Sequence, residues 1–418
     1  MRLSFMGSAA SIVVLGAWLP AFGAEALTLP RLQELVAHNT PQVLAAHTAL
    51  REAQGARSGA TPLFAQNPSI TGGAGLTAQP AGWRPRDWDG GGAALLQLQV
   101  PIEIGGQRWL RVAAADARIQ TQELQRQAAV IAAHALATAA FYRVLHAQGH
   151  ARVAGEAVAL AARLRGAAQQ LRDAGLASLL DVELAGLEEA EAAQNQAALQ
   201  ALAVRGRTEL LAAVGLSPEA YSNVTGDFIS PGPLPTLDAA LQRTGQRPDI
   251  LALRAQQAAS LRDASVAAAE ALPTPTLGAS YQYQYQFPAA QHMVLGQVSF
   301  PLPVFARGQG EEARARARAR GTADQEHQAL LNARAEVRAA HALVLEIRAA
   351  RQLVSRPPED TLAMTQRLEH AYVQRHADLG TVLNMQRRLV ALRRTALDLD
   401  LQEALAWVWL NTAMGVAS

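Results

Sequence analysis

The chain of 418 residues is short of cysteine, lysine and aromatic side chains. It has no cysteine and no lysine, and only 5% of its residues are aromatic. Without cysteine there can be no disulfide, thiolate metal site or thiol nucleophile, and no acylated N-terminal cysteine of the kind that anchors bacterial lipoproteins. The 37 basic residues are all arginines and face 35 acidic ones, which leaves a net charge of +2. So small a net charge gives no bulk attraction to nucleic acid, and we expect no nucleic-acid partner.

Alanine is the abundant residue. About 90 positions carry it, in a chain that is 50% hydrophobic. Alanine has the highest helix propensity of all residues, and it lets neighbouring helices approach closely. Outside the N-terminus, no run reaches the roughly 18 apolar residues that a membrane-spanning helix needs. The composition therefore predicts a mainly α-helical protein with closely packed helices.

The N-terminus has the three parts of a secretory signal peptide. Arg2 supplies a positive charge, residues 12–19 form a short apolar stretch, and Ala24-Glu25-Ala26 offers a cleavage site. We expect residues 1–26 to be a signal peptide that exports the protein from a Gram-negative cytoplasm. A buried N-terminal helix is the alternative interpretation.

The rest of the chain contains an internal repeat. The aligned pairs include Pro41 with Pro248, Pro101 with Pro301, Leu179 with Leu379, and Val182 with Val382. This self-similarity predicts two copies of about 200 residues, at 27–229 and 237–418, joined by a Pro/Gly-rich linker at 230–236.

Each copy has the same predicted plan of helix, β-hairpin, long helix, tip and return helix. In the first copy these elements fall at residues 41–59, 67–102, 107–171, 172–178 and 179–214. In the second they fall at 248–271, 275–302, 311–372 (broken at 357–358 by two prolines), 374–380 and 381–414. A helix of about 65 residues is about 100 Å long and must bury its apolar side against neighbouring helices.

The second hairpin carries the clearest strand pattern. Tyr281, Tyr283, Tyr285 and Phe287 alternate with glutamines. Such alternation indicates a strand whose two faces meet different surroundings, and lipid outside with water inside accounts for it. The alternative is the half-buried sheet of a soluble protein.

Four strands cannot close a membrane barrel, because the smallest known barrels have eight. An open sheet in lipid would leave unpaired edges, so the chain must form an oligomer. A dimer would give eight strands around a filled interior, and a trimer would give twelve around a lumen.

With these features in place, the chain resembles the TolC-like family of outer-membrane efflux proteins over nearly its whole length. The tip strings AGLASLLDV (174–182) and AYVQRHADLGTVLN (371–384) carry this resemblance. Residues 100–117 (VPIEIGGQRWLRVAAADA) and 300–317 (FPLPVFARGQGEEARARA) are similar to its heavy-metal branch, the cobalt-zinc-cadmium (CzcC-like) proteins.

The resemblance implies a mainly α fold in which a homotrimer forms a long helical barrel and a 12-strand barrel in outer-membrane lipid. It also implies a periplasmic adaptor and an inner-membrane resistance-nodulation-division (RND) pump as partners, with no cofactor and no enzymatic activity. The expected function is export of heavy-metal cations. The alternatives are a multidrug or type I secretion duct and, from a different class, a periplasmic coiled-coil scaffold.

In the family, aspartates at the tips narrow the periplasmic mouth and favour cations. The residues that the resemblance places at the tips are Gly175, Ser178, Asp181, Asp378, Thr381 and Asn384. Asp181 falls on an acidic position of the family, whereas Thr381 and Asn384 replace acids, which Asp378 or Asp173 could offset. Ordinary solvated charges are the alternative interpretation.

Two pairs of histidines are candidate metal ligands. His146 and His150 stand four residues apart and so share one face of the predicted helix, but no third ligand lies near them in the sequence. The alternative is that these two histidines are exposed or lie between helices without binding metal, and the absence of a third ligand favours it. His370 and His376 flank the second tip together with Asp378 and could contact a passing cation.

Overall fold

The computed structural model describes residues 26–64, 66–78, 90–228, 232–286, 289–302, 304–305, 307–354 and 359–417. Several residues discussed above lie outside the described residues. They are residues 1–25 of the expected signal peptide, residues 229–231 at the start of the linker, Phe287, and the prolines at 357 and 358.

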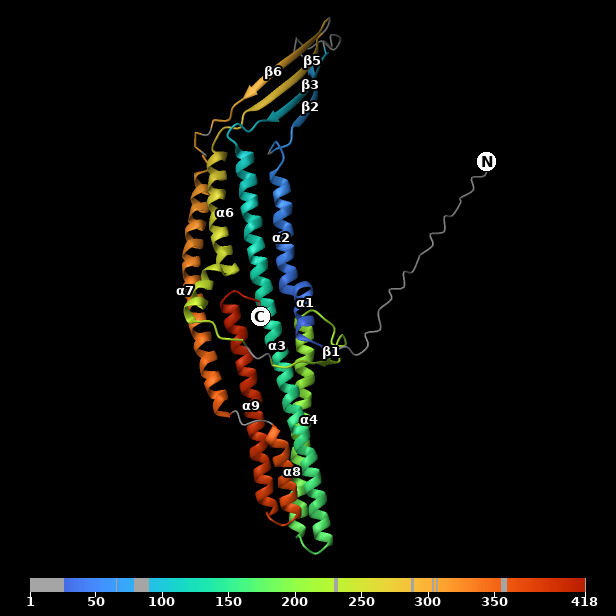
Figure 1. The fold of residues 1–418 in the computed structure, drawn as a ribbon. Coiled ribbons are helices and arrows are strands. Elements are labelled where there is room, and N and C mark those ends of the chain that lie inside the picture. The colour runs from blue at the N-terminus through green and yellow to red at the C-terminus, as the bar shows by residue number, and fades with distance from the viewer. Residues whose placement is uncertain are drawn as a thin grey trace, which may run out of the picture.

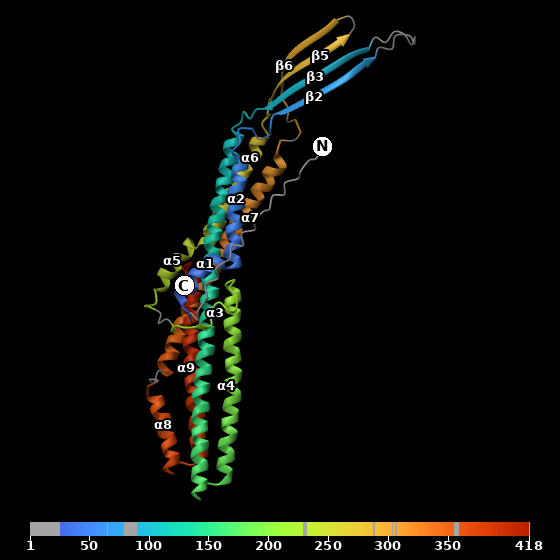
Figure 2. The same cartoon turned by 90° about the vertical axis from the view of Figure 1, so that its right-hand side faces the viewer.

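The molecule is elongated, with long helices running side by side, a β-sheet at one end and two helical hairpins at the other (Figures 1 and 2). The elements of the first half are β1 (Ala26–Leu27), α1 (Leu29–Asn39), α2 (Pro41–Ala60), β2 (Ser69–Ala78), β3 (Gly90–Pro101), α3 (Gln107–Asp173), α4 (Leu179–Ala213) and β4 (Asn223–Val224). Those of the second half are α5 (Leu237–Arg243), the 3-10 turn η1 (Thr244–Gln246), α6 (Pro248–Glu270), β5 (Thr276–Gln286), β6 (Ala289–Ser299), α7 (Gln309–Val354), α8 (Glu359–Val373) and α9 (Leu379–Ala413).

The short elements in the middle of the molecule are absent from the sequence-based plan. These are α1, α5, η1, and the strands β1 and β4, which pair in parallel through Ala26 with Asn223 and Leu27 with Val224. Two-residue strands have no periodicity to detect, and they form here because tertiary packing brings distant segments together.

Both long helices begin with the same local structure. Gly106 and Gly308 take φ values of 72° and 69° directly before α3 and α7. The glutamine that follows each glycine turns its side-chain oxygen back to the backbone: Gln107 accepts from the Gly105 amide at 2.8 Å, and Gln309 accepts from the Arg307 amide at 2.7 Å. This side-chain cap satisfies an amide where the chain turns from strand to helix.

Large buried side chains gather at the level of the short elements. The main cluster surrounds Phe141 of α3 and includes Leu27, Leu32, Val36, Leu210, Leu211 and Val224, all of them at most 1% exposed. Nearer the sheet, alanines such as Ala115, Ala259 and Ala315 are the buried residues where α3, α6 and α7 pack together. These small side chains let the helix axes come close, as the composition predicts.

The helix α3 is long and apolar enough to cross a membrane by length and composition alone. The apolar side chains Phe141 and Val144 are buried against other parts of the same chain, each at most 1% exposed. Packing within the chain buries part of this apolar stretch, 39% of its most apolar 18-residue window, and the rest of it is not covered by the single chain.

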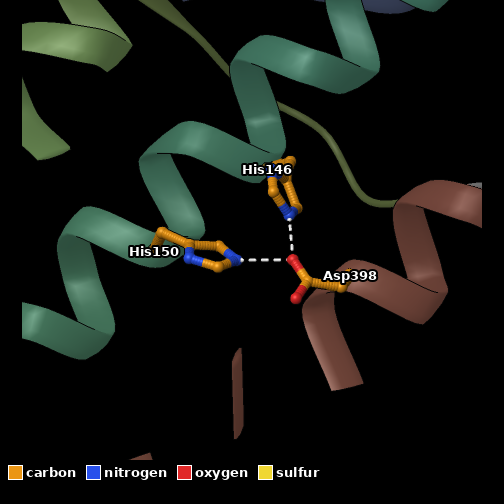
Figure 3. A group of neighbouring side chains, drawn as sticks. All are labelled: His146, His150 and Asp398. Atoms are coloured by element: carbon orange, nitrogen blue, oxygen red, sulfur yellow. Dashed lines mark hydrogen bonds and ion pairs between the residues drawn. The ribbon is translucent and has the colours of Figure 1, made fainter. Parts of the chain in front are cut away.

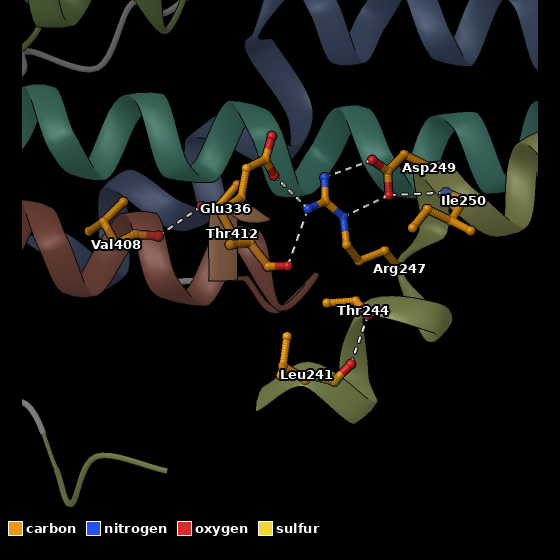
Figure 4. A network of polar contacts seen from close by, with 9 residues as sticks. Leu241, Thr244, Arg247, Asp249, Ile250, Glu336, Val408 and Thr412 are labelled. Atoms are coloured by element: carbon orange, nitrogen blue, oxygen red, sulfur yellow. Dashed lines mark hydrogen bonds and ion pairs between the residues drawn. The ribbon is translucent and has the colours of Figure 1, made fainter. Parts of the chain in front are cut away.

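Arg247, at the start of α6, connects three parts of the second half (Figure 4). Its guanidinium donates to Asp249 at 2.8 Å, to Glu336 of α7 at 2.8 Å, and to the carbonyl of Ala413 at the end of α9 at 3.2 Å. Burial opposes its charge, but the hydrogen bonds that it donates to Asp249 and Glu336 raise its pKa. The network connects the end of α9 to the start of α6.

Candidate functional site

The four long strands form one antiparallel sheet in the order β2-β3-β5-β6. Its registers place Leu96 of β3 beside Tyr281 of β5, and Tyr281 beside Val294 of β6. Since side chains alternate along each strand, the residues that lie side by side in one row across the sheet share a face.

One face of the sheet is apolar and the other is rich in glutamine. The apolar face carries Ile70, Leu76, Leu96, Leu98, Leu277, Tyr281, Tyr283, Tyr285, Val294 and Val298, together with His292, whose Nδ1 lies 2.7 Å from the Tyr281 hydroxyl. The opposite face carries Gln97, Gln99, Gln282, Gln284, Gln291 and Gln297, mixed with Leu95, Met293 and Leu295. Across this second face, the Gln97 amide donates to Gln297 at 3.4 Å. The expected alternation is therefore present; whether the apolar face contacts lipid stays a prediction.

The apolar face is uncovered in the single chain. Leu76 is 84% exposed, Val294 is 78% and Ile70 is 72%. The predicted outward residues Tyr281 and Tyr285 are 43% and 37% exposed, and Tyr283 is half-buried against the ring of His292. Phe287, the fourth, lies outside the described residues. An apolar surface of this extent on a free chain indicates a surface that another phase or molecule covers.

Both edges of the sheet are open. Among the described strands, β2 pairs with β3 alone and β6 pairs with β5 alone. Each edge therefore presents a row of unpaired backbone amides and carbonyls, which favours pairing with another chain.

At the opposite end of the molecule, the two tips have the same backbone structure although their sequences differ. Gly175 has a φ of 71° in the first tip, and Arg375 has a φ of 60° in the second. In each tip the next amide donates to the last turn of the preceding helix: Leu176 to Leu171 at 2.7 Å, and His376 to Ala371 at 2.8 Å. Glycine adopts this left-handed conformation freely, whereas the Cβ atom of arginine makes the conformation unfavourable.

The tip acids cap the return helices. Asp181 and Ser178 form a capping box at the start of α4, in which the Asp181 carboxylate accepts from the Ser178 amide at 3.0 Å and from its hydroxyl at 2.9 Å. Asp378 is the N-cap of α9 and accepts from the Thr381 hydroxyl at 2.6 Å and from its amide at 3.0 Å. These hydrogen bonds lower the pKa of Asp378, and the one from the Thr381 hydroxyl has the largest effect. They therefore favour the ionised carboxylate. Both carboxylates thus stabilise helix N-termini.

The two helical hairpins pack against each other near the tips. Leu164 of α3, Tyr372 of α8 and Val382 of α9 belong to one buried cluster. Arg387 of α9 donates to Glu188 of α4 at 2.5 Å, which ties the two return helices together. Burial, and to a smaller degree the Asp181 charge, raises the pKa of Tyr372. The tips of both halves of the chain therefore form one end of the molecule.

The remaining predicted tip residues add no negative charge. Thr381 donates its hydroxyl to Asp378, and Asn384 accepts from Arg388 at 3.3 Å. His370 and His376 are exposed, and within the described residues they join no group of side chains able to hold a metal ion.

His146 and His150 do have a third polar partner, which the sequence reading missed. Both rings point from α3 toward Asp398 of α9 (Figure 3). The Asp398 carboxylate oxygen Oδ1 lies 2.7 Å from His146 Nε2 and 3.1 Å from His150 Nε2. Burial and the neighbouring His146 lower the pKa of His150, although Asp398 acts in the opposite direction. The sequence separation of the two helices hid this carboxylate, and no local signal could have revealed it.

Comparison with known proteins gives a likeness of fold. The sequence matches no protein-family model and no curated protein. The structure is similar to the outer-membrane channel OprN, at 21% identity over 93% of this chain and 89% of that one, with a TM-score of 0.69. It is similar to CusC, which forms a transmembrane channel, at 18% identity over 93% and 92% of the two chains, with a TM-score of 0.71.

A third similar structure is the outer-membrane protein VceC of Vibrio cholerae, at 19% identity, 93% and 96% coverage and a TM-score of 0.69. The chain has the fold of outer-membrane channels. The predicted fold class, mainly α with a small four-stranded β part, is thereby confirmed. These neighbours are channel and membrane proteins rather than enzymes.

Proposed function

We propose that this protein is the outer-membrane channel subunit of a tripartite RND efflux system and that heavy-metal cations are its cargo. The observation that carries the proposal is the two-faced sheet with two open edges at one end of a long helical stem. Lipid covers an apolar outer face, and water meets the glutamines inside.

The open edges support a trimer. If β6 of one copy pairs with β2 of the next, three chains close a barrel of twelve strands and no backbone edge remains in lipid. A dimer would close only eight strands, whose interior side chains fill. The long helices of three chains then continue the barrel as a periplasmic tube.

The tips form the entrance of this tube, where an inner-membrane pump and a periplasmic adaptor deliver the cargo. Asp181 and Asp378 lie at this end, and three copies of each would surround the mouth. A ring of carboxylates in a narrow passage attracts cations. The similarity of residues 100–117 and 300–317 to the cobalt-zinc-cadmium branch also favours metal cargo over the multidrug and type I secretion alternatives.

Deleting the gene tests the function and its cargo together. We expect the deletion strain to tolerate severalfold less zinc, cobalt or cadmium in growth assays, with restoration by a plasmid copy. Detergent and copper are scored in parallel. Lost drug tolerance with unchanged metal tolerance would identify a multidrug duct, and recovery of the protein as a soluble periplasmic species would identify the scaffold.

Removing the Asp181 charge should weaken the preference of the open channel for cations. Because the carboxylate also caps α4, Asp181→Asn separates charge from capping, and Asp181→Ala removes both. We expect both variants to lower the cation-to-anion permeability ratio by about twofold in single-channel recordings. Ser178→Ala, which breaks the capping box and keeps the charge, is the control. Unchanged selectivity in both Asp181 variants would show that the acid serves the helix alone.

A further inference from the structure

The histidine–aspartate cluster in the middle of the stem is unused by the proposed channel. His146 and His150 occupy successive turns of α3, and Asp398 reaches them from α9 (Figure 3). Their ligand atoms all lie within 4.8 Å of one another. Two helices from opposite halves of the chain thus direct three metal-ligating groups at one point.

Close packing of the two helices makes this approach possible. A Cβ atom on Gly149 would lie 3.3 Å from the side chain of Leu397, the residue before Asp398. The lack of a side chain at Gly149 therefore lets α9 come near enough to α3 for the Asp398 carboxylate to reach both imidazoles. A Cβ atom at position 149 would require the Leu397 side chain to shift by a few tenths of an ångström.

The spacing of the cluster suits a tetrahedral ion. Zinc binds imidazole nitrogen and carboxylate oxygen at about 2.0–2.1 Å, which places neighbouring ligand atoms about 3.3 Å apart. The two nitrogen–oxygen distances here, 2.7 Å and 3.1 Å, are slightly shorter. Small side-chain movements would therefore admit an ion among the three groups.

The surroundings leave one coordination position open. The side chains of His146 and His150 are 22% and 13% exposed, whereas that of Asp398 is 47% exposed. Water or a passing ligand can thus reach the metal position. Arg394, one turn before Asp398 on α9, acts on His150 with its positive charge. This charge weakens cation binding and favours an exchangeable ion over a permanently held one.

We propose that His146, His150 and Asp398 form a binding site for one divalent transition-metal cation of the zinc type per chain. Imidazole nitrogens suit zinc, cobalt, nickel and copper, whereas calcium and magnesium require a full set of oxygen ligands. The site lies within a single chain, so it depends neither on the trimer nor on the proposed cargo. A bound ion would also connect the two repeats, because α3 belongs to the first and α9 to the second.

Zinc titration of the full-length protein in detergent tests the site. The protein carries a purification tag without histidines and is first treated with a chelator. Isothermal titration calorimetry should give one zinc per chain, and calcium should give no signal. His150→Ala and Asp398→Asn should each weaken zinc binding by about tenfold or more, because each removes a direct ligand. Cobalt(II) should give the visible absorption of a tetrahedral complex in the parent protein and lose it in both variants.

The control is the double variant His370→Ala/His376→Ala, which removes the exposed tip histidines and should leave the stoichiometry at one. Circular dichroism and trimer migration report whether each variant is folded, and Asp398→Asn keeps the side-chain shape if His150→Ala does not fold. The proposal is overturned if the parent protein binds no zinc, if the two cluster variants bind it unchanged, or if binding disappears with the tip histidines. Since binding is measured on purified protein, an absent metal phenotype in the deletion strain would reject the proposed cargo and leave this site untouched.

Discussion

Val294→Arg should remove the protein from the outer membrane. Val294 lies at the centre of β6 on the apolar face and is 78% exposed in the single chain. In the proposed barrel it faces the middle of the bilayer, where an arginine costs about 2–4 kcal/mol per site. Three copies in a trimer multiply this cost, so we expect the heat-resistant trimer to disappear from outer-membrane fractions.

Gln291→Arg is the matched control for this substitution. Gln291 lies on the same strand but on the opposite face, where it is paired with Gln284. An arginine there points into water, and we expect the amount of trimer to stay within about twofold of the parent level. If both arginine variants accumulate equally in the outer membrane, the apolar face does not contact lipid. If the glutamine variant alone is lost, the two faces have been assigned the wrong way round.

Gly215→Ala should strongly destabilise the helical stem. Gly215 follows α4 with a φ of 76°, and a Cβ atom there would lie 2.7 Å from the carbonyl oxygen of Asn39, at the end of α1. The left-handed conformation alone costs a side chain about 1–2 kcal/mol, and the contact with backbone adds to this. We expect a loss of about 3 kcal/mol or more, measured as a lower unfolding temperature by circular dichroism at a fixed scan rate.

Two other glycines provide a graded comparison. Gly206 lies within α4, where an added Cβ would meet Val144 at an ordinary 3.6 Å, so Gly206→Ala should be neutral or stabilise by up to about 1 kcal/mol. Gly415 follows α9 with a φ of 74°, and an added Cβ would lie 2.9 Å from Cγ and 3.2 Å from Cα of Arg247. Because Arg247 is held by its hydrogen bonds to Asp249, Glu336 and Ala413, Gly415→Ala should also destabilise the protein, by about 2 kcal/mol or more. Equal effects of all three substitutions would refute this account.

Local patterns predicted the long elements well. Period-two alternation identified β5 and β6, because side-chain direction in a strand depends only on position along the chain. The absence of proline predicted a helix over residues 107–171, and α3 begins at Gln107 as predicted and ends at Asp173, two residues later than predicted. The double proline at 357–358 predicted the interval between α7, which ends at Val354, and α8, which begins at Glu359. Each of these features depends only on residues that are close together in the sequence.

The tips show where sequence reasoning was incomplete. The resemblance placed Asp181 and Asp378 at the mouth as charges, whereas the structure also gives both carboxylates hydrogen bonds at helix N-termini. The equivalence of Gly175 and Arg375 is visible only in their shared left-handed backbone. Both residues follow a helix whose last turn accepts the same backbone hydrogen bonds from the tip, a likeness that residue type alone does not reveal.

Helix length and strand periodicity are properties of the chain read in order, and the sequence by itself determined a mainly helical protein with a small four-stranded β part. The absence of cysteine had already excluded disulfides and thiolate metal sites. Only the tertiary structure decided which distant groups meet: Asp398 beside His146 and His150, Arg247 beside Glu336, and the open edges on β2 and β6. These contacts depend on how whole helices and strands pack, because a side chain a few ångströms away in space can be hundreds of residues away in sequence.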